Sequence, residues 1–477
     1  AFAQVKQATV LVNGISCDLE QGILKVEFVT PDVVRVQYTG ENTFIGNGTD
    51  VCLPRAVDNP VRWVYTPNPD CYLLKSDSLI VRVDLSTAFI TYLDKEGRLL
   101  LQEDQNIPRI SEKRVTKQVI YDEHSKHIEK TADGDKEIKN VLRYDIIGHT
   151  WKYRINFKWQ PLEALYGWGA HMEDYMNLRG KELYLCQHNL KAMVPVLNST
   201  AGYGLLFDAG CAMMFKDNSE GSFVELEAAK QIDYYFMKGK TMDAVVANYR
   251  MLTGNSPMMP LYLFGYIQSK ERYVSSDDLI NTLKEYRQRQ IPIDMIVQDW
   301  NYWPEGQWGN MSMNPKFYPD KRKLADEIHS LHAKLMISIW PNAMNCPQHE
   351  EFKRKGWLLS GTSVYDAFNP LARKLYWNYA NNEFFGNGFD AWWCDASEPL
   401  DADWTFMKDG YGADNHRQRW ELNTNLLNSV LGAERSQLYS LYHAKGIYEN
   451  QRSTNEDKRV VNLTRSSYAG QQRYSTI

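Results

Sequence analysis

The second half of the chain alternates short apolar runs with segments of helical spacing, and this alternation constrains the fold more than any other feature. The predicted strands cover residues 261–268, 293–298, 335–340, 390–394 and 459–463. The predicted helices cover residues 276–290, 321–332, 371–385 and 416–445. Strands that alternate with helices form a parallel sheet, and units of this size fit a (β/α)8 TIM barrel. A doubly wound open sheet is the alternative, although no Gly-rich phosphate loop follows any of these runs.

The first half carries a different pattern, in which apolar residues alternate with polar ones as they do in antiparallel strands. Two such runs, 23–29 and 33–38, are separated by a Pro-Asp turn, which is a hairpin signal. Residues 111–140 are highly charged and are predicted to form a solvated hairpin or a mobile loop. The predicted parts are an N-terminal antiparallel β-sandwich over 1–235, a linker helix over 236–257, and the first five strands of a barrel over 258–477.

Charged and aromatic side chains follow the apolar runs of the second half. The carboxyl ends of barrel strands meet at one face, and barrel enzymes carry out their chemistry there. The run that ends at Cys394 is followed at once by Asp395, with Glu398 three residues further on. We therefore predict that Asp395 is a reactive carboxylate. The structural alternative is that Asp395 and Glu398 cap the next helix or pair with a nearby base.

Five ordered motifs lie at or near these strand ends. They are Gln268-Ser269-Lys270-Glu271-Arg272-Tyr273, Val297-Gln298-Asp299-Trp300, Ile337-Ser338-Ile339-Trp340-Pro341, Trp393-Cys394-Asp395-Ala396-Ser397-Glu398-Pro399 and Leu463-Thr464-Arg465-Ser466-Ser467. Together the motifs resemble those of glycoside hydrolase family 31, the retaining α-glycosidases, and the likeness extends over most of the chain. Asn177-Leu178-Arg179-Gly180-Lys181 in the first half is similar to the β-sandwich of that family, whose loop helps to wall the active site.

The resemblance implies a role for each matching residue. Asp395 matches the catalytic nucleophile of the family. Asp299 and Arg465 are expected to hydrogen-bond to the hydroxyl groups of the terminal sugar, and Trp340 is expected to line its site. The predicted substrate-binding residues are Asp299, Trp340, Arg465, Lys270, Arg272, Trp300, Trp393 and Glu398.

A retaining mechanism needs a second carboxyl group, about 5–5.5 Å from the nucleophile, to protonate the leaving oxygen. In the family this general acid/base is an Asp that follows the segment matched by Gln472-Arg473-Tyr474, so it is expected beyond Ile477. Five predicted strands cannot close an eight-stranded barrel, and we therefore predict that the chain is an excerpt of a longer protein. The substitutes available within the chain are Glu398, Asp401 and Asp403.

The predicted function is hydrolysis of terminal α-linked glycosides from the non-reducing end, with net retention. Residues 298–303 and 268–273 look more like the α-xylosidase side of the family than like its starch-acting α-glucosidases, so α-xylosides are the favoured substrates. α-Galactosidase, α-glucosidase and α-transglucosylase activities stay open. A catalytically inactive carbohydrate-binding protein is the alternative from another class, favoured by the 14 Trp and 29 Tyr residues, whose rings can stack on sugars.

Composition excludes several other classes. A net charge of −5 gives no electrostatic case for nucleic acid or an anionic membrane as a partner. The seven cysteines show no CxxC spacing, which argues against a zinc site and a disulfide scaffold, and no cofactor is expected. No apolar run reaches the roughly 18 residues of a membrane span. Ala1-Phe2-Ala3-Gln4 resembles the end of a signal-peptidase site, from which we expect export to the periplasm or the medium.

Overall fold

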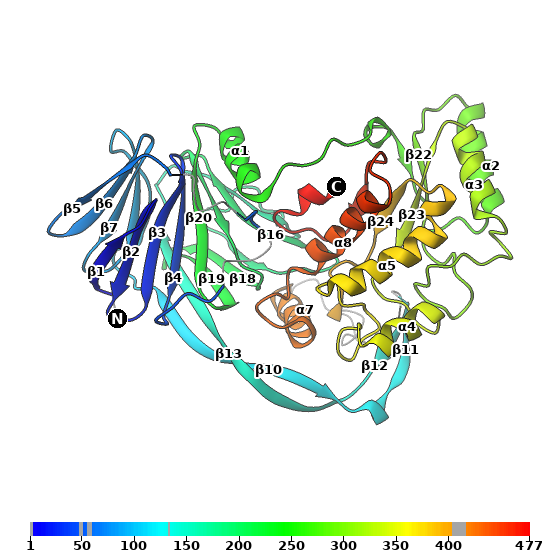
Figure 1. Cartoon of the computed structure of the whole chain (residues 1–477), viewed down its shortest axis with the longest axis horizontal. Coiled ribbons are helices and arrows are strands. Elements are labelled where there is room, and N and C mark those ends of the chain that lie inside the picture. Colours follow the sequence, from blue (N-terminus) through cyan, green and yellow to red (C-terminus); the bar gives the residue numbers. More distant parts are fainter. Residues whose placement is uncertain (1–2, 47–50, 55–59, 132–133, 403–415) are drawn as a thin grey trace.

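The computed structural model describes residues 3–46, 51–54, 60–131, 134–402 and 416–477 (Figure 1). Ala1, Phe2 and Asp403, which entered the sequence predictions, lie outside these ranges. Two antiparallel sheets make up the N-terminal half, and a parallel sheet with its helices makes up the C-terminal half. None of the helices within the described ranges is long and apolar enough to cross a membrane.

The first antiparallel sheet has eight strands, and its apolar residues alternate as the sequence predicts. In β3, Leu24, Val26 and Phe28 are buried while the residues between them are partly exposed. In spatial order its strands are β1 (Val5–Val10), β2 (Gly14–Leu19), β3 (Ile23–Thr30), β4 (Val33–Thr39), β20 (Ile232–Lys238), β17 (Tyr203–Phe207), β16 (Ala192–Ser199) and β14 (Leu165–Ala170).

The second antiparallel sheet packs on the first through a shared apolar core. Tyr92 of one sheet stacks on Phe236 of the other, with ring centroids 3.9 Å apart, and its hydroxyl hydrogen-bonds to that of Tyr234. In spatial order its strands are β15 (Glu182–Leu185), β18 (Met213–Asn218), β19 (Gly221–Ala229), β13 (Val141–Lys158), β9 (Leu99–Glu103), β8 (Ile90–Asp94), β7 (Leu79–Asp84), β6 (Cys71–Ser76) and β5 (Trp63–Pro67), with β10 (Ile110–Tyr121) paired to β13.

A long hairpin, here called the arm (residues 110–150), extends from the second sheet toward the parallel sheet (Figure 1). Its strands β10 and β13 pair from Ile110 opposite Arg154 to Tyr121 opposite Val141. The short 3-10 helix η1 (Glu123–Ser125) and the strand pair β11 (His127–Thr131) and β12 (Gly134–Ile138) complete the arm. The charged stretch of the sequence therefore forms a hairpin.

Helix α1 (Met242–Thr253) follows the sandwich and lies within the segment expected to form a linker. The side chain of Thr241 accepts a hydrogen bond from the backbone N–H of Ala244, which caps its first turn. Gly254, whose φ of +99° suits glycine, ends the helix, and its N–H donates to the carbonyl of Arg250.

The C-terminal half contains a five-stranded parallel sheet in sequential order. Its strands are β21 (Ile267–Gln268), β22 (Met295–Gln298), β23 (Lys334–Ile339), β24 (Ala391–Cys394) and β25 (Asn462–Thr464). Helices surround it, and they are α2 (Ser276–Gln288), α3 (Lys321–Ser330), α4 (Pro347–Lys355), α5 (Pro370–Glu383), α7 (His416–Leu431) and α8 (Tyr439–Thr454). Three 3-10 turns, η2 (Leu261–Phe264), η3 (Phe385–Asn387) and η4 (Gln471–Tyr474), complete this half.

The two faces of the parallel sheet meet different surroundings. Ile296, Ile337 and Trp392 point toward the helices and belong to the larger apolar core. Met336 and Ala391 point to the opposite face, where they form a smaller apolar cluster with neighbouring strands. The antiparallel sheets agree with the predicted N-terminal half, and the parallel strands form a half-barrel sheet; the prediction of a barrel only partly contained in the chain is not confirmed.

Three predictions about elements were wrong in detail. Residues 261–268 were predicted to form one strand, but Leu261–Phe264 is a 3-10 turn and only Ile267–Gln268 pairs with β22. Residues without a neighbouring strand cannot form a ladder, and Leu261 and Phe264 are 86% and 76% exposed.

The long predicted helix 416–445 is two helices. Gly432 has φ +86°, a conformation that ends α7, and the chain turns before α8 begins. Helix α4 was not predicted, although Pro347 stands in its first turn, where proline is favourable.

Candidate active site

The register of the parallel strands brings four predicted or newly found polar residues to one face. Val297 pairs with Met336, and Trp393 pairs with both Ser338 and Leu463. Side chains two residues apart share a face of a strand. Two positions beyond Val297, Met336, Trp393 and Leu463 stand Asp299, Ser338, Asp395 and Arg465. These four side chains therefore lie on the same inner face, toward the carboxyl ends of their strands.

Arg465 joins two of the predicted acidic residues. Its Nε and Nη2 donate to Oε1 and Oε2 of Glu398 at 2.9 and 2.8 Å, which is a bidentate pair. Its Nη1 lies 3.1 Å from Oδ1 of Asp395. The Glu398 side chain is 1% exposed, whereas those of Asp395 and Arg465 are 22% and 20% exposed. Asp395 is thus the more accessible carboxylate of the two.

A backbone group also orients Asp395. The N–H of Ala396 donates to Oδ1 of Asp395 at 2.8 Å, and Ala396 adopts φ +49°. Two donors on one oxygen fix the plane of the carboxylate. Arg465 therefore places its single positive charge beside both Asp395 and Glu398.

Asp299 lies at the end of the adjacent strand, in a different environment. Ser338 Oγ donates to its Oδ1 at 2.9 Å, and the N–H of Trp300 donates to the same oxygen at 2.7 Å. Burial raises the pKa of Asp299 above its usual range, and these two hydrogen bonds oppose the shift while the charge of Glu271 adds to it.

Four tryptophans pack together at the ends of β22 and β23. Trp303 lies between Trp308 and Trp340, with ring centroids 5.2 Å from each, and Trp300 lies 5.5 Å from Trp308. The guanidinium of Arg272 stands 5.3 Å from the Trp300 ring. Aromatic walls beside carboxylates are the setting in which proteins bind sugars, because the rings stack on the apolar faces of pyranoses.

Two predicted substrate-binding residues, Lys270 and Trp393, make their contacts away from the Asp395 cluster. Lys270 is exposed, pairs with Asp278 at 3.5 Å and lies over the Tyr273 ring. Trp393 is partly buried and packs against the small apolar cluster on the inner face of the sheet. It stands two residues before Asp395. Trp340 is buried at 3% exposure.

A buried charged cluster connects the sandwich to the candidate site. Lys191, whose side chain is fully buried, pairs with Glu173 at 2.7 Å, and Trp420 Nε1 donates to the same oxygen at 3.1 Å. His188 Nε2 lies 3.6 Å from Oδ1 of Asp401, one of the substitute acids. Asp401 therefore faces the sandwich, and Asp403 is outside the described ranges.

Sequence reasoning missed Ser338 and Trp308. Ser338 could have been found as a hydroxyl inside the otherwise apolar run 335–340. Trp308 had no such signal, because it lies in irregular chain between β22 and α3. Over the ranges that the structure describes, no three His, Cys, Asp or Glu side chains are arranged to hold a metal ion.

Comparison with protein families gives one match. The family described as "Glycosyl hydrolases family 31 TIM-barrel domain" matches residues 256–477, which contain every predicted site residue.

Known proteins similar to this chain point the same way. An alpha-xylosidase of Saccharolobus solfataricus is 30% identical over 464 residues, covering 95% of this chain and 57% of the relative. The crystal structure of a GH31 alpha-xylosidase from a soil metagenome, complexed with xylose, superposes with a TM-score of 0.78 at 23% identity, over 99% of this chain and 67% of that one. A GH31 dextranase of Flavobacterium johnsoniae, complexed with glucose, superposes with a TM-score of 0.76 at 19% identity, over 100% and 56%. The chain spans little more than half the length of the Saccharolobus relative.

Proposed function

The chain belongs to glycosyl hydrolase family 31 through its barrel domain, and on that premise we propose that it carries the nucleophile of a retaining α-glycosidase. The observation that supports the proposal most strongly is the contact of Arg465 with both Asp395 and Glu398 at the ends of neighbouring parallel strands. The buried Glu398 holds the guanidinium, and the guanidinium contacts the accessible Asp395. Burying a charged pair costs desolvation free energy, so stability alone does not account for this arrangement.

In the proposed reaction Asp395 attacks C1 of the terminal sugar and forms a covalent glycosyl-enzyme. A proton donor protonates the leaving oxygen, and water then hydrolyses the intermediate with a second inversion, so the anomeric configuration is retained. Asp299 and Arg465 bind sugar hydroxyls, and the tryptophans at the ends of β22 and β23 form the wall on which the ring packs. No cofactor takes part in these steps.

The proton donor is proposed to lie outside this chain. Both oxygens of Glu398 accept hydrogen bonds from Arg465 and its side chain is 1% exposed, so Glu398 is poorly placed to reach a leaving oxygen. Asp401 is buried beside His188 on the sandwich side. These contacts weigh against both residues as substitutes.

An azide-rescue experiment on the full-length protein tests the role of Asp395. Asp395→Ala is expected to lose hydrolysis by about 10⁴-fold or more, because covalent catalysis is lost. Azide should restore turnover of an aryl α-glycoside and give the β-glycosyl azide, since it attacks from the face that the carboxylate occupied. Asp326→Ala, which removes an exposed carboxylate of α3, is the control and should behave as wild type. An Asp395→Ala protein with wild-type activity contradicts the assignment.

An α-xyloside is the proposed sugar substrate. The Saccharolobus relative, named alpha-xylosidase, supports this choice, while relatives named alpha-glucosidase support the runner-up. Aryl α-xyloside, α-glucoside and α-galactoside should be assayed side by side, and the highest kcat/KM is expected for the xyloside. A higher value for another sugar contradicts the xyloside assignment and leaves the retaining mechanism untouched. Binding of oligosaccharides without hydrolysis would instead indicate an inactive carbohydrate-binding protein.

A further inference from the structure

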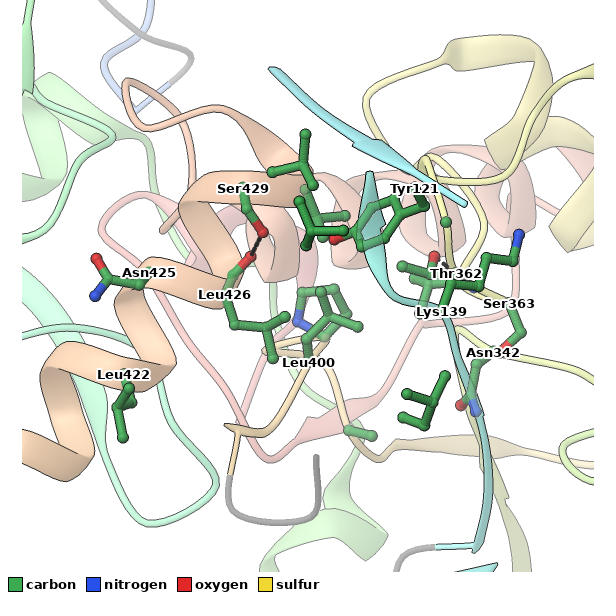
Figure 2. A pocket seen from close by; sticks show the side chains of 18 of the residues that line it. Tyr121, Lys139, Asn342, Thr362, Ser363, Leu400, Leu422, Asn425, Leu426 and Ser429 are labelled. Atoms are coloured by element: carbon green, nitrogen blue, oxygen red, sulfur yellow. Dashed lines mark hydrogen bonds between the residues drawn. The ribbon is translucent and has the colours of Figure 1, made fainter. Parts of the chain in front are cut away.

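The pocket shown in Figure 2 lies outside the candidate site. It has a volume of about 380 Å³, and helix α7 and the arm form two of its sides. The described residues that line it include neither of the two strand-end aspartates, nor Ser338, nor Arg465. It meets the site only through Ala396 and Pro399, in the loop that follows Asp395. Recognition of the sugar in the proposed reaction therefore has to be sought among the residues around the carboxylates.

Ser338 is a polar residue in a place that suits an apolar one. It stands in β23, the central strand of the parallel sheet, and it is 0% exposed, as are its neighbours Ile337 and Ile339. A hydroxyl enclosed in this way costs free energy unless it is hydrogen-bonded. Among the described residues, its Oγ bonds to Oδ1 of Asp299 alone, at 2.9 Å. An apolar side chain would fill the place without that cost, so the serine points to a role beside Asp299.

The backbone around Ser338 is firmly held. Strand β23 pairs with β22 on one side and with β24 on the other, where Ser338 lies opposite Trp393. The hydroxyl of Tyr302, a residue that is 1% exposed, donates to the carbonyl of Ser338 at 3.0 Å. Because both neighbouring strands and Tyr302 fix this backbone, the Ser338 hydroxyl can hold its partner carboxylate in one orientation.

Asp299 and Asp395 are held by the same pattern of donors. In each, Oδ1 accepts a hydrogen bond from the N–H of the residue that follows, at 2.7 and 2.8 Å. In each, a side chain from the neighbouring strand or its end approaches that same oxygen, Ser338 for Asp299 and Arg465 for Asp395. The difference is charge. The side-chain donor to Asp299 is a neutral hydroxyl, and within the described ranges Asp299 forms no ion pair.

This arrangement leaves one oxygen of Asp299 for a ligand. Both hydrogen bonds go to Oδ1, and no described residue bonds to Oδ2. Asp299 is partly exposed, so Oδ2 can accept from a sugar hydroxyl. Burial raises the pKa of Asp299, and the hydrogen bond from Ser338 opposes that shift, which favours the ionised form. An ionised carboxylate is a stronger acceptor than a neutral one.

We infer that Ser338 is a positioning residue, which turns the Asp299 carboxylate so that Oδ2 meets one particular hydroxyl of the terminal sugar. The inference rests on the proposed function, since the sugar concerned is the one that Asp395 attacks. Ser338 is fully buried and acts through Asp299 without touching the sugar. Recognition of one hydroxyl therefore depends on a residue behind the site.

The test uses the full-length protein with an aryl α-glycoside of the preferred sugar and with its 2-, 3- and 4-monodeoxy analogues. For each substrate, kcat/KM of a variant is divided by that of wild type, so the intrinsic reactivity of the substrate cancels. Asp299→Asn identifies the hydroxyl that Asp299 binds, because the substitution should be silent on the analogue that lacks it. An Asp299→Asn variant that lowers all four values equally overturns the inference.

Ser338→Ala should follow the same pattern. We expect kcat/KM to fall by about tenfold on the parent glycoside and on two of the analogues, the usual effect of losing a hydrogen bond to a charged group. On the analogue that lacks the hydroxyl bound by Asp299, kcat/KM should stay within about twofold of wild type. Ser338→Cys should show this loss too, because a thiol fills the space of the hydroxyl but donates weakly. It also replaces Ser338→Ala if the smaller side chain prevents folding.

Ser222→Ala is the matched control. Its hydroxyl also donates to a buried carboxylate, that of Asp217, but in the sandwich. All four values should stay within about twofold of wild type. The inference is overturned if the Ser338 variants keep wild-type values, or if they lower all four values equally, as a general loss of structure would. Inactive Asp395→Ala beside unaffected Ser338 variants contradicts the inference alone, whereas a wild type that hydrolyses none of the glycosides contradicts the proposed function and the inference with it.

Discussion

At the scale of single residues, the candidate site depends on how Arg465 is divided between two carboxylates. Two of its nitrogens bind Glu398, and the third reaches Asp395. A lysine could not make both contacts, because its ammonium is a single point charge without the planar fork of a guanidinium. We therefore propose that Glu398 positions Arg465, and its predicted contact with substrate stays a prediction.

Glu398→Gln should weaken this arrangement while preserving its shape. Among the described residues, the substitution leaves Asp395 as the remaining acidic contact of Arg465 and weakens a largely buried bidentate pair, so we expect a loss of about 2–3 kcal/mol in the free energy of unfolding. Because Arg465 would no longer be held against Asp395, kcat should fall as well. Chemical denaturation and steady-state kinetics measure the two effects.

Glu285→Gln is the control for that variant. It breaks an exposed pair with Arg289 on α2, which should contribute no more than about 0.5 kcal/mol. Equal losses in the two variants would contradict the special role of Glu398.

Asp299→Asn should separate stability from activity. Since burial raises the pKa of Asp299, the folded state binds its proton more tightly than the unfolded state does. Ionisation of Asp299 therefore lowers the free energy of unfolding. This loss grows as the pH rises above about 3.9, the pKa of an Asp side chain in the unfolded state. The variant should be at least as stable as wild type at pH 7, and this advantage should shrink toward pH 3. Denaturation at several pH values measures it.

The same variant should lose activity at pH 7. A hydrogen bond from a sugar hydroxyl to a carboxylate contributes about 2 kcal/mol, which corresponds to a fall of about 30-fold in kcat/KM. An Asn variant that is both less stable at neutral pH and fully active would contradict the account of Asp299.

Sequence reasoning reached the charged residues of the site and missed the contacts between them. Asp395 could be named because it follows an apolar run directly, and Asp299 and Arg465 because they match motifs of the family that the sequence resembles. Pairing of Glu398 with a nearby base was the structural alternative, but Arg465 could not be named as that base, since the two residues are 67 positions apart. Trp308 was missed for the same reason, because irregular chain carries no periodicity that places a side chain.

At the scale of elements, the register of the parallel sheet determines which residues of the site lie side by side. One buried carboxylate, that of Asp390, also connects two of its strands. Oδ2 of Asp390, at the start of β24, lies 2.7 Å from His329 Nε2 on α3 and accepts a hydrogen bond from the N–H of Leu335 on β23. Lys458 lies 3.3 Å away from its other oxygen. Asp390 thus connects β23, β24 and α3.

Asp390→Asn should destabilise the protein in a pH-dependent way. Burial alone would raise the pKa of Asp390, but the hydrogen bond from His329 and the charge of Lys458 lower it below its usual value. Its ionised form therefore stabilises the fold above about pH 3.9, and this contribution is lost as the pH falls through the folded pKa. The gap in unfolding free energy between wild type and variant should be largest near pH 6 and should close below about pH 4. A gap that widens toward low pH would contradict this sign.

Strands and helices were predicted well where packing follows a simple period. Met295, Ile296 and Val297 are all fully buried, as a strand covered on both faces requires, and their apolar run was visible in the sequence. The run 261–268 looked the same, yet most of it forms a turn, because composition does not tell whether a neighbouring strand is present to pair with it. The end of α7 was signalled by Gly432, which was passed over within a long helical pattern.

At the scale of the whole molecule, the sandwich and the parallel-sheet half share one apolar core. Leu441 and Tyr468 from the second half pack in the same cluster as the sandwich strands. Gln187 is buried and follows β15 closely in the chain. Its Nε2 donates to the carbonyl of Ser467, and its Oε1 accepts from the hydroxyl of Ser466, just before Tyr468 enters this core. The sandwich thereby supports the loop that follows Arg465.

Gln187→Ala should weaken this junction and the site together. Several buried polar groups, namely the carbonyls of Ser467 and Met193 and the hydroxyl of Ser466, lose their partner, so a loss of about 2–3 kcal/mol in unfolding free energy is expected. A fall in kcat should accompany it, because Arg465 adjoins the loop. Gln288→Ala, at the exposed end of α2, should change neither quantity. Unchanged stability in Gln187→Ala would contradict the role of the junction.

The division of the chain into an antiparallel and a parallel half was visible in its periodicity. The docking of the arm was not, because the charged stretch 111–140 suggests only solvation. Tyr121 meets Gly361 across 240 residues, and such a contact leaves no local trace in the sequence.

The central claim is that Asp395 forms the covalent bond to the sugar, and trapping the intermediate tests it most directly. The full-length protein would be treated with a 5-fluoro α-glycosyl fluoride of its preferred sugar, digested, and analysed by peptide mass spectrometry. The account predicts the mass of one fluorosugar on the peptide that contains Asp395, with fragmentation placing it on that side chain. A label on Asp299, Glu398 or any other carboxylate would contradict it.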